Sequence, residues 1–136
     1  MNYFDITEFI INPDAKVVPI DVVQKLDTYH KPILNAIRHV LGVPVIISKH
    51  SGYRSIEWDK KRGRDGSSQH TFIGKGAVDV RSNKKFEDLL DLLIDSDYMR
   101  VCYYPHHGFV HCDYKGWHRQ YFEADKSGRW HFKKNR

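Results

Sequence analysis

Two short segments of this chain carry the side chains best suited to chemistry. The first places His70 and Asp79 on either side of a loop that contains glycines, and the second places His111 inside an apolar run. Two histidines and one carboxylate form a ligand set that can hold a catalytic zinc ion and leave a fourth position for water. The residue types therefore predict a zinc site, on the condition that the fold brings the apolar run beside the loop.

Two of these residues also have simpler interpretations. Asp79 lies between apolar neighbours, and because an unpaired buried carboxylate is costly, it needs either a metal or a salt bridge to Arg54 or Arg81. His111 is either a metal ligand or a core histidine bonded to a carbonyl group. We predict the metal site, because a set of three possible ligands is more specific than any single histidine.

The same positions carry a resemblance to a known family. The sequence resembles the Ser-x-His-x-x-Gly-x-Ala-x-Asp pattern of the M15 zinc D-Ala-D-Ala carboxypeptidases and endopeptidases at Ser68, His70, Gly74, Ala77 and Asp79. Between the first histidine and the aspartate this chain has two additional residues. Residues 52–55 resemble the Gly-Tyr-Arg-Ser element of that family. Residues 108–113 resemble the Phe-Val-His-x-Asp strand of its phage and bacterial branch.

The resemblance, which covers about residues 45–115, implies both a function and a fold. It implies a peptidase that cuts a peptide bond in bacterial peptidoglycan with one zinc ion, held by His70, Asp79 and His111. It also implies that Arg54 and Ser68 bind the substrate. The implied fold is α+β, with a small antiparallel sheet and flanking helices as in hedgehog and D-Ala-D-Ala peptidases. We expect a single domain over residues 1–136.

The general base has two candidates, because Gly108 stands three residues before His111, where many relatives carry an acid. Asp113 follows on the same face of the predicted strand. It either accepts a proton from the attacking water or fixes the second ring nitrogen of the histidine. His107 lies on that face as well, next to the position of the missing acid. The sequence leaves this choice open.

The composition indicates one folded domain. Of 136 residues, 40% are hydrophobic and 13% aromatic, which favours a packed core over disorder. No apolar stretch reaches membrane-spanning length, so we expect no membrane insertion. No signal-peptide pattern is visible, so we expect synthesis in the cytoplasm and release to the cell wall by a phage-type route. We further expect a monomer, and buried free thiols at Cys102 and Cys112.

The charge distribution leaves an alternative function open. The net charge of +5 is concentrated in residues 60–64 and 126–136. A basic surface attracts anionic polymers, so the alternative is a non-catalytic binding module of the same fold that contacts cell-wall polymer or nucleic acid. This alternative stays open because Gly108 stands where many relatives carry an acid that could serve as the general base. Our first prediction is the peptidase, with a peptidoglycan peptide as its partner and no nucleic acid.

The elements that must position the site follow from hydrophobic periodicity. An apolar stripe predicts helical structure over residues 20–41, with a break or kink at Pro32 and an end at Gly42. The remaining pattern predicts a surface loop at 60–66, a helix at 83–95, strands at 45–47, 77–81, 99–104 and 108–114, and a last hairpin from 121–122 and 130–132. Asp79 and His111 thus fall on two predicted strands.

Overall fold

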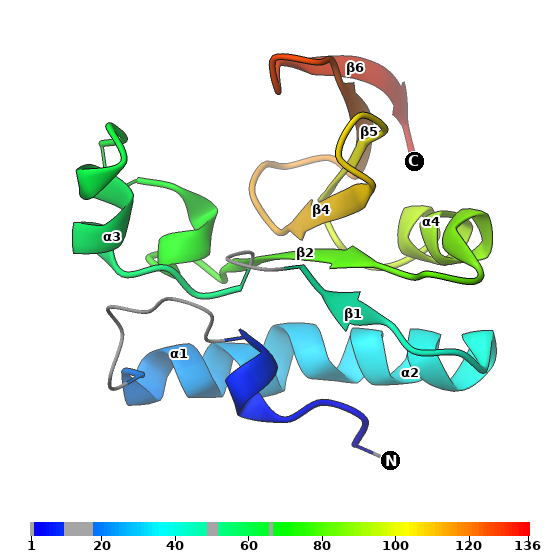
Figure 1. Cartoon of the computed structure of the whole chain (residues 1–136), viewed down its shortest axis with the longest axis horizontal. Helices are drawn as coiled ribbons and strands as arrows, with labels where there is room; N and C mark the ends of the chain where they lie inside the picture. The colour runs from blue at the N-terminus through cyan, green and yellow to red at the C-terminus, as the bar shows by residue number, and fades with distance from the viewer. Residues whose placement is uncertain (1, 10–17, 49–51, 66) are drawn as a thin grey trace.

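The computed structural model describes residues 2–9, 18–48, 52–65 and 67–136. Six strands form one sheet, and helices lie against it (Figure 1). The helical elements are η1 (Ile6–Phe9), α1 (Ile20–Lys25), η2 (Leu26–His30), α2 (Lys31–Leu41), α3 (Ile56–Lys61), η3 (Gln69–Thr71) and α4 (Phe86–Ile94). The strands are β1 (Ile46–Ile47), β2 (Ala77–Arg81), β3 (Arg100–Tyr104), β4 (Phe109–Asp113), β5 (Gln120–Ala124) and β6 (Trp130–Asn135).

The sheet has the strand order β1-β2-β4-β3-β5-β6. Neighbouring strands are antiparallel, except that β3 and β5 run parallel. The predicted α+β class is confirmed, and the parallel pair is a feature that the sequence did not predict. No helix in the described part of the chain has the length and apolar character needed to cross a bilayer.

The two faces of the sheet have different roles. Alternate residues of β2, β3 and β4 point to a core shared with the helices, among them Val78, Val80, Val101, Val110 and Cys112. In Figure 1, α1 and α2 run along this side of the sheet. Because side chains alternate along a strand, Asp79 and His111 project from the opposite face. Cys102 also lies on that face, so the two buried free thiols do not face each other.

The predicted break at Pro32 takes the form of a π-helical turn. The turn η2 lies between α1 and α2, and Pro32 stands at the start of α2, where its missing N–H costs little. His30 ends this turn and is fully buried. Its Nε2 donates to the Lys75 carbonyl at 2.9 Å, and its Nδ1 accepts from the Tyr98 hydroxyl at 2.8 Å. The neutral ring therefore ties the helix to the loop that precedes β2.

Replacing His30 with glutamine should remove a specific source of acid sensitivity. Burial lowers the pKa of His30 from 6.5 to about 4, so its contribution to stability is present above pH 6.5 and is lost as the pH falls through about 4. This pKa difference corresponds to about 3 kcal/mol. Urea unfolding of chelator-treated protein at pH 7 and pH 4 measures the loss. We expect a smaller loss in the His30→Gln variant, and equal losses in the two proteins would contradict this assignment.

The middle of the loop between His70 and Asp79, which is two residues longer than the resembled pattern, lies at the surface. Residues 73–75 are exposed, whereas Phe72 and Gly76 on either side of them are buried. Phe72 has a φ of 59° and Gly76 a φ of 90°, so the chain turns sharply at both points. A Cβ atom at position 76 would collide with the Phe72 ring. The loop thus bulges outward, and β2 starts in register with β4.

Two segments differ from the sequence-based prediction. Residues 60 and 61 belong to α3, where a surface loop was predicted, and Ser55 starts this helix by accepting from the Trp58 amide at 3.1 Å. Gly66, in the same predicted loop, lies outside the described residues. The final hairpin is longer than predicted, because β5 spans Gln120–Ala124 and β6 spans Trp130–Asn135.

Candidate metal centre

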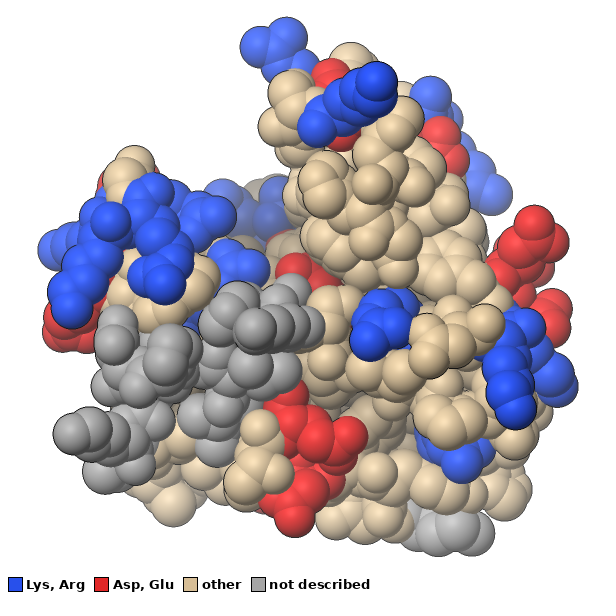
Figure 2. Space-filling view, in the orientation of Figure 1, with Lys and Arg blue, Asp and Glu red and all other residues tan. Residues whose placement is uncertain are grey.

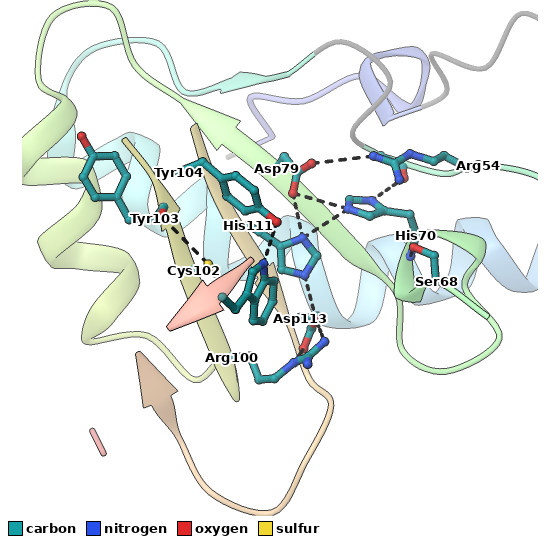
Figure 3. A network of polar contacts seen from close by, with 12 residues as sticks. Arg54, Ser68, His70, Asp79, Arg100, Cys102, Tyr103, Tyr104, His111 and Asp113 are labelled. Carbon is teal, nitrogen blue, oxygen red and sulfur yellow. Dashed lines mark hydrogen bonds and ion pairs between the residues drawn. The ribbon is translucent and has the colours of Figure 1, made fainter. Parts of the chain in front are cut away.

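Three buried side chains converge on the face of the sheet that is turned away from α1 and α2 (Figure 3). His70 Nε2 lies 3.4 Å from Asp79 Oδ1 and 3.3 Å from His111 Nδ1. His111 Nδ1 lies 2.8 Å from the same Asp79 oxygen. The structure therefore brings together the three residues that the sequence predicted as metal ligands.

Backbone pairing explains why these side chains meet. Strands β2 and β4 pair with Asp79 directly opposite His111. His70 lies on the short turn η3, which is capped by Ser68, whose hydroxyl accepts from the His70 amide at 3.2 Å. The His70 carbonyl in turn accepts from the Arg54 amide at 2.8 Å. The sheet register and this capped turn together fix the triangle of donor atoms.

The other ring nitrogen of each histidine is also held. His70 Nδ1 donates to the Gly52 carbonyl at 2.9 Å, and His111 Nε2 donates to Asp113 Oδ2 at 2.7 Å. Position 52 must be small, because a Cβ there would collide with the backbone of Phe9. Hydrogen bonds of this kind fix the orientation of metal-binding imidazoles and raise their basicity. They turn His70 Nε2 and His111 Nδ1 toward the Asp79 carboxylate.

The spacing of the three donor atoms fits a zinc ion. Tetrahedral zinc with bonds of about 2.0–2.1 Å holds its ligand atoms about 3.3–3.4 Å apart. Two of the three spacings are 3.3 and 3.4 Å, and the third, 2.8 Å, is that of a hydrogen bond between His111 and Asp79. Two imidazoles and a carboxylate are also ligands that zinc prefers. The described residues thus provide three positions and leave room for a fourth ligand.

The electrostatics of the cluster favour an ionised Asp79 and a protonated His111, whereas burial lowers the pKa of His70. Burial alone would raise the pKa of Asp79, but His70 and His111 outweigh it and hold that pKa well below its usual range. For His111, burial would lower the pKa, and the hydrogen bonds to Asp113 and Asp79 instead raise it to about 9. The Asp79 carboxylate is therefore ionised at neutral pH, as a metal ligand must be.

Asp113 lies beneath His111 and is fully buried. Its Oδ1 accepts from Arg100 Nε at 2.8 Å and from the Lys115 amide at 3.0 Å. Its Oδ2 accepts from Arg100 Nη2 and from His111 Nε2. Both carboxylate oxygens are thus occupied. Of the two roles that the sequence left open, the geometry favours fixing the histidine ring over accepting a proton from water.

Replacing Asp113 with asparagine should weaken zinc binding by about 10–100-fold, the usual effect of removing the carboxylate behind a metal-bound histidine. The amide cannot hold both Arg100 and His111 as the carboxylate does. Competition with a chromophoric chelator measures the affinity. The exposed residue Asp97 provides the matched control, Asp97→Asn, which should bind zinc normally. Equal affinities in the two variants would show that Asp113 does not support the site.

A cleft of about 560 Å³ opens over the three side chains. Figure 2 shows the hollow between α3 and the β5–β6 hairpin, with lysines and arginines on both sides. Its lining consists of Arg54, Arg64, Ser67, Ser68, Gln69, His70, Asp79, Arg100, Tyr104, His107, Phe109, His111, Lys115, Lys126, Ser127, Gly128 and Trp130. Of the four other predicted site residues, Arg54, Ser68 and His107 line the cleft, and Asp113 does not.

Arg54 and Ser68 approach the centre from the same side (Figure 3). Arg54 Nη2 lies 3.9 Å from Asp79 Oδ2, the oxygen that faces away from His111. Asp59, an acid close to Arg54 in the sequence, lies 3.5 Å from Arg64 Nη1. The Ser68 hydroxyl accepts from the His70 amide as the cap of η3 and donates to none of the described residues. Both side chains therefore present donors to the cleft beside the three predicted ligands.

Sequence reasoning missed Arg100 and Trp130. The Trp130 ring lies 5.1 Å from the His111 ring and donates from Nε1 to the Tyr104 hydroxyl at 2.6 Å. Arg100 was detectable, because extending the predicted hairpin backward from its turn pairs it with Asp113. No comparable sequence signal pointed to Trp130, because it lies on the last strand of the sheet, which does not pair with the strands that carry the site.

Comparison with known proteins gives one family match. The family model described as Peptidase M15 matches residues 2–113. The matched region contains the His70, Asp79 and His111 cluster and ends with β4, so β5 and β6 lie outside it. No curated protein matches the chain.

Proposed function

This chain belongs to the peptidase M15 family, and we propose that it is a zinc peptidase that hydrolyses a peptide bond in bacterial peptidoglycan, in a stem peptide or a cross-bridge. The observation that carries the proposal is the triangle of His70, Asp79 and His111 at the base of an open cleft. A buried set of ligands that leaves one side open to a cleft is the arrangement of a catalytic metal site, whereas structural zinc sites are closed.

In this proposal His70 Nε2, Asp79 Oδ1 and His111 Nδ1 hold the zinc ion. Zinc supplies a Lewis acid that polarises a carbonyl group and lowers the pKa of water. The protein supplies the geometry. Asp113 and the Gly52 carbonyl keep the two imidazoles oriented. The three ligand side chains are buried, which limits their contact with bulk water.

Arg54 and Ser68 bind the substrate in this mechanism. The Arg54 guanidinium offers paired donors that match a carboxylate or a peptide carbonyl, and it lies beside the Asp79 carboxylate. Because it carries a fixed positive charge, it stabilises the negative charge that develops on the carbonyl oxygen during attack. The Ser68 hydroxyl donates to the substrate backbone from the adjacent wall of the cleft.

His107 is the proton acceptor in this mechanism. Asp113 is buried with both oxygens occupied, and Gly108 has no side chain that can accept a proton. Among the described cleft residues, the other histidine and carboxylate side chains are those of His70, Asp79 and His111, the proposed metal ligands. The His107 imidazole at the cleft wall takes the proton from the attacking water and returns it to the leaving amine.

Digestion of purified peptidoglycan tests the proposed function. The zinc-loaded protein should release soluble peptides or single amino acids, a chelator should stop the release, and added zinc should restore it. Mass spectrometry of the products identifies the bond that is cut. Binding to peptidoglycan without release of any fragment would contradict the proposal and favour the non-catalytic binding module instead.

A further inference from the structure

The turn between β5 and β6 forms one wall of the cleft, although it lies outside the family match. Lys126, Ser127 and Gly128 of this turn line the cleft, and so does Trp130 at the start of β6. The family relationship thus explains the metal centre and leaves this wall unassigned. The residues of this wall determine what it can bind.

The turn is held rigid by Asp125. Its Oδ1 accepts from the Ser127 amide at 3.0 Å, the Ser127 hydroxyl at 2.7 Å and the Arg129 amide at 3.0 Å. Its Oδ2 accepts from His131 Nε2 at 2.9 Å. The only acid of the turn is therefore engaged within it. A turn fixed in this way holds the Lys126 backbone at the cleft, so binding does not have to order the turn itself.

Trp130 fixes the turn relative to the metal centre. Its ring packs against His111, and the Arg100 guanidinium lies 4.7 Å above it. The Tyr104 hydroxyl accepts its indole N–H. These contacts come from β3 and β4, so the last hairpin is anchored on the strands that carry the site. The distance between Lys126 and the metal centre is therefore set by packing.

The charges that line the cleft are unbalanced. Arg54, Arg64 and Arg100 each lie within 4.0 Å of a carboxylate, namely those of Asp79, Asp59 and Asp113. Lys115 and Lys126 have no carboxylate partner within that distance among the described residues, and both line the cleft. Two unpaired ammonium groups in a shared hollow raise the local concentration of anions. A ligand that carries a negative group would neutralise these two ammonium groups.

We propose that Lys126 and Lys115 form a subsite for a carboxylate that the substrate peptide carries outside the bond that is cut. This proposal rests on the proposed function, because that function identifies the substrate as a peptide. Lys126 and Arg54 reach the cleft from different elements, because Lys126 belongs to the β5–β6 turn and Arg54 to the segment before α3. The last hairpin thereby becomes an element that selects acidic peptides.

The test uses two peptidoglycan stem peptides that differ in one group, an internal carboxylate that is free in one and amidated in the other. Both are offered to the zinc-loaded full chain at low salt. KM is measured where the peptide is cleaved, and Kd by calorimetry where it is not. We expect the free carboxylate to be preferred by about fivefold, the limit for an ion pair in contact with water. Salt should weaken the preference.

Variants identify the residues responsible. Lys126→Gln and Lys115→Gln should each reduce the preference, and the double variant should bring it close to one. Lys134→Gln is the matched control, because Lys134 is an exposed lysine of β6 that does not line the cleft. Equal affinity of the wild-type chain for both peptides would overturn the subsite. A preference that survives the double variant, or that Lys134→Gln removes, would do the same.

The two proposals fail in different ways. If neither peptide is cleaved but the acidic one binds more tightly through Lys126 and Lys115, the peptidase function is wrong and the subsite stands. If both peptides are cleaved with equal KM, the function stands and the subsite is wrong.

Discussion

Replacing His70 with alanine is expected to abolish zinc binding and peptide hydrolysis together. The variant keeps only Asp79 and His111 of the proposed ligands, and two ligands do not form a catalytic zinc site. His70 is the most suitable of the three for this test, because removing His111 would leave Asp79 and Asp113 buried without their shared partner. Elemental analysis measures the zinc content, and peptidoglycan digestion measures the activity.

Stability gives a second measurement that does not depend on turnover. Zinc at about 1,000 times its Kd should stabilise the wild-type fold by about 4 kcal/mol, and this gain should disappear in His70→Ala. The exposed residue His118 provides the matched control, His118→Ala, which should keep zinc, stability gain and activity. A His70→Ala protein that retains a full equivalent of zinc would remove His70 from the site.

Replacing His107 with alanine is expected to lower kcat by about 10²–10⁴-fold, the range for loss of a general base. Zinc content should not change, because His107 is outside the ligand triangle. Steady-state kinetics of peptide release measure kcat, and elemental analysis measures the zinc content.

The neighbouring histidine supplies the control for this experiment. His106 lies in the same turn but does not line the cleft, so His106→Ala should retain the wild-type rate and zinc content. A normal rate in His107→Ala would exclude it as the base. Because Asp113 has both oxygens occupied, that result would require an acceptor other than the two that the sequence suggested.

Much of the fold could be predicted because its signals are local. The apolar stripe over residues 20–41, the end of that helix at Gly42 and the strands that carry Asp79 and His111 all follow from spacing along the chain. The helix α3 was missed, because its six residues give too short an amphipathic pattern. The parallel pairing of β3 with β5 was missed as well, since strand neighbours far apart in sequence leave no local signal.

By itself, the sequence determined the three proposed ligands and four residues predicted to act beside them, because ligand chemistry depends on residue type. Only the tertiary structure decided the rest. The register of β2 and β4 set Asp79 opposite His111, and the hairpin of β3 and β4 occupied Asp113 with Arg100. Folding of the last hairpin over the site brought Trp130 and Lys126 to the cleft. Distances between side chains on different strands depend on backbone pairing, which residue types alone do not specify.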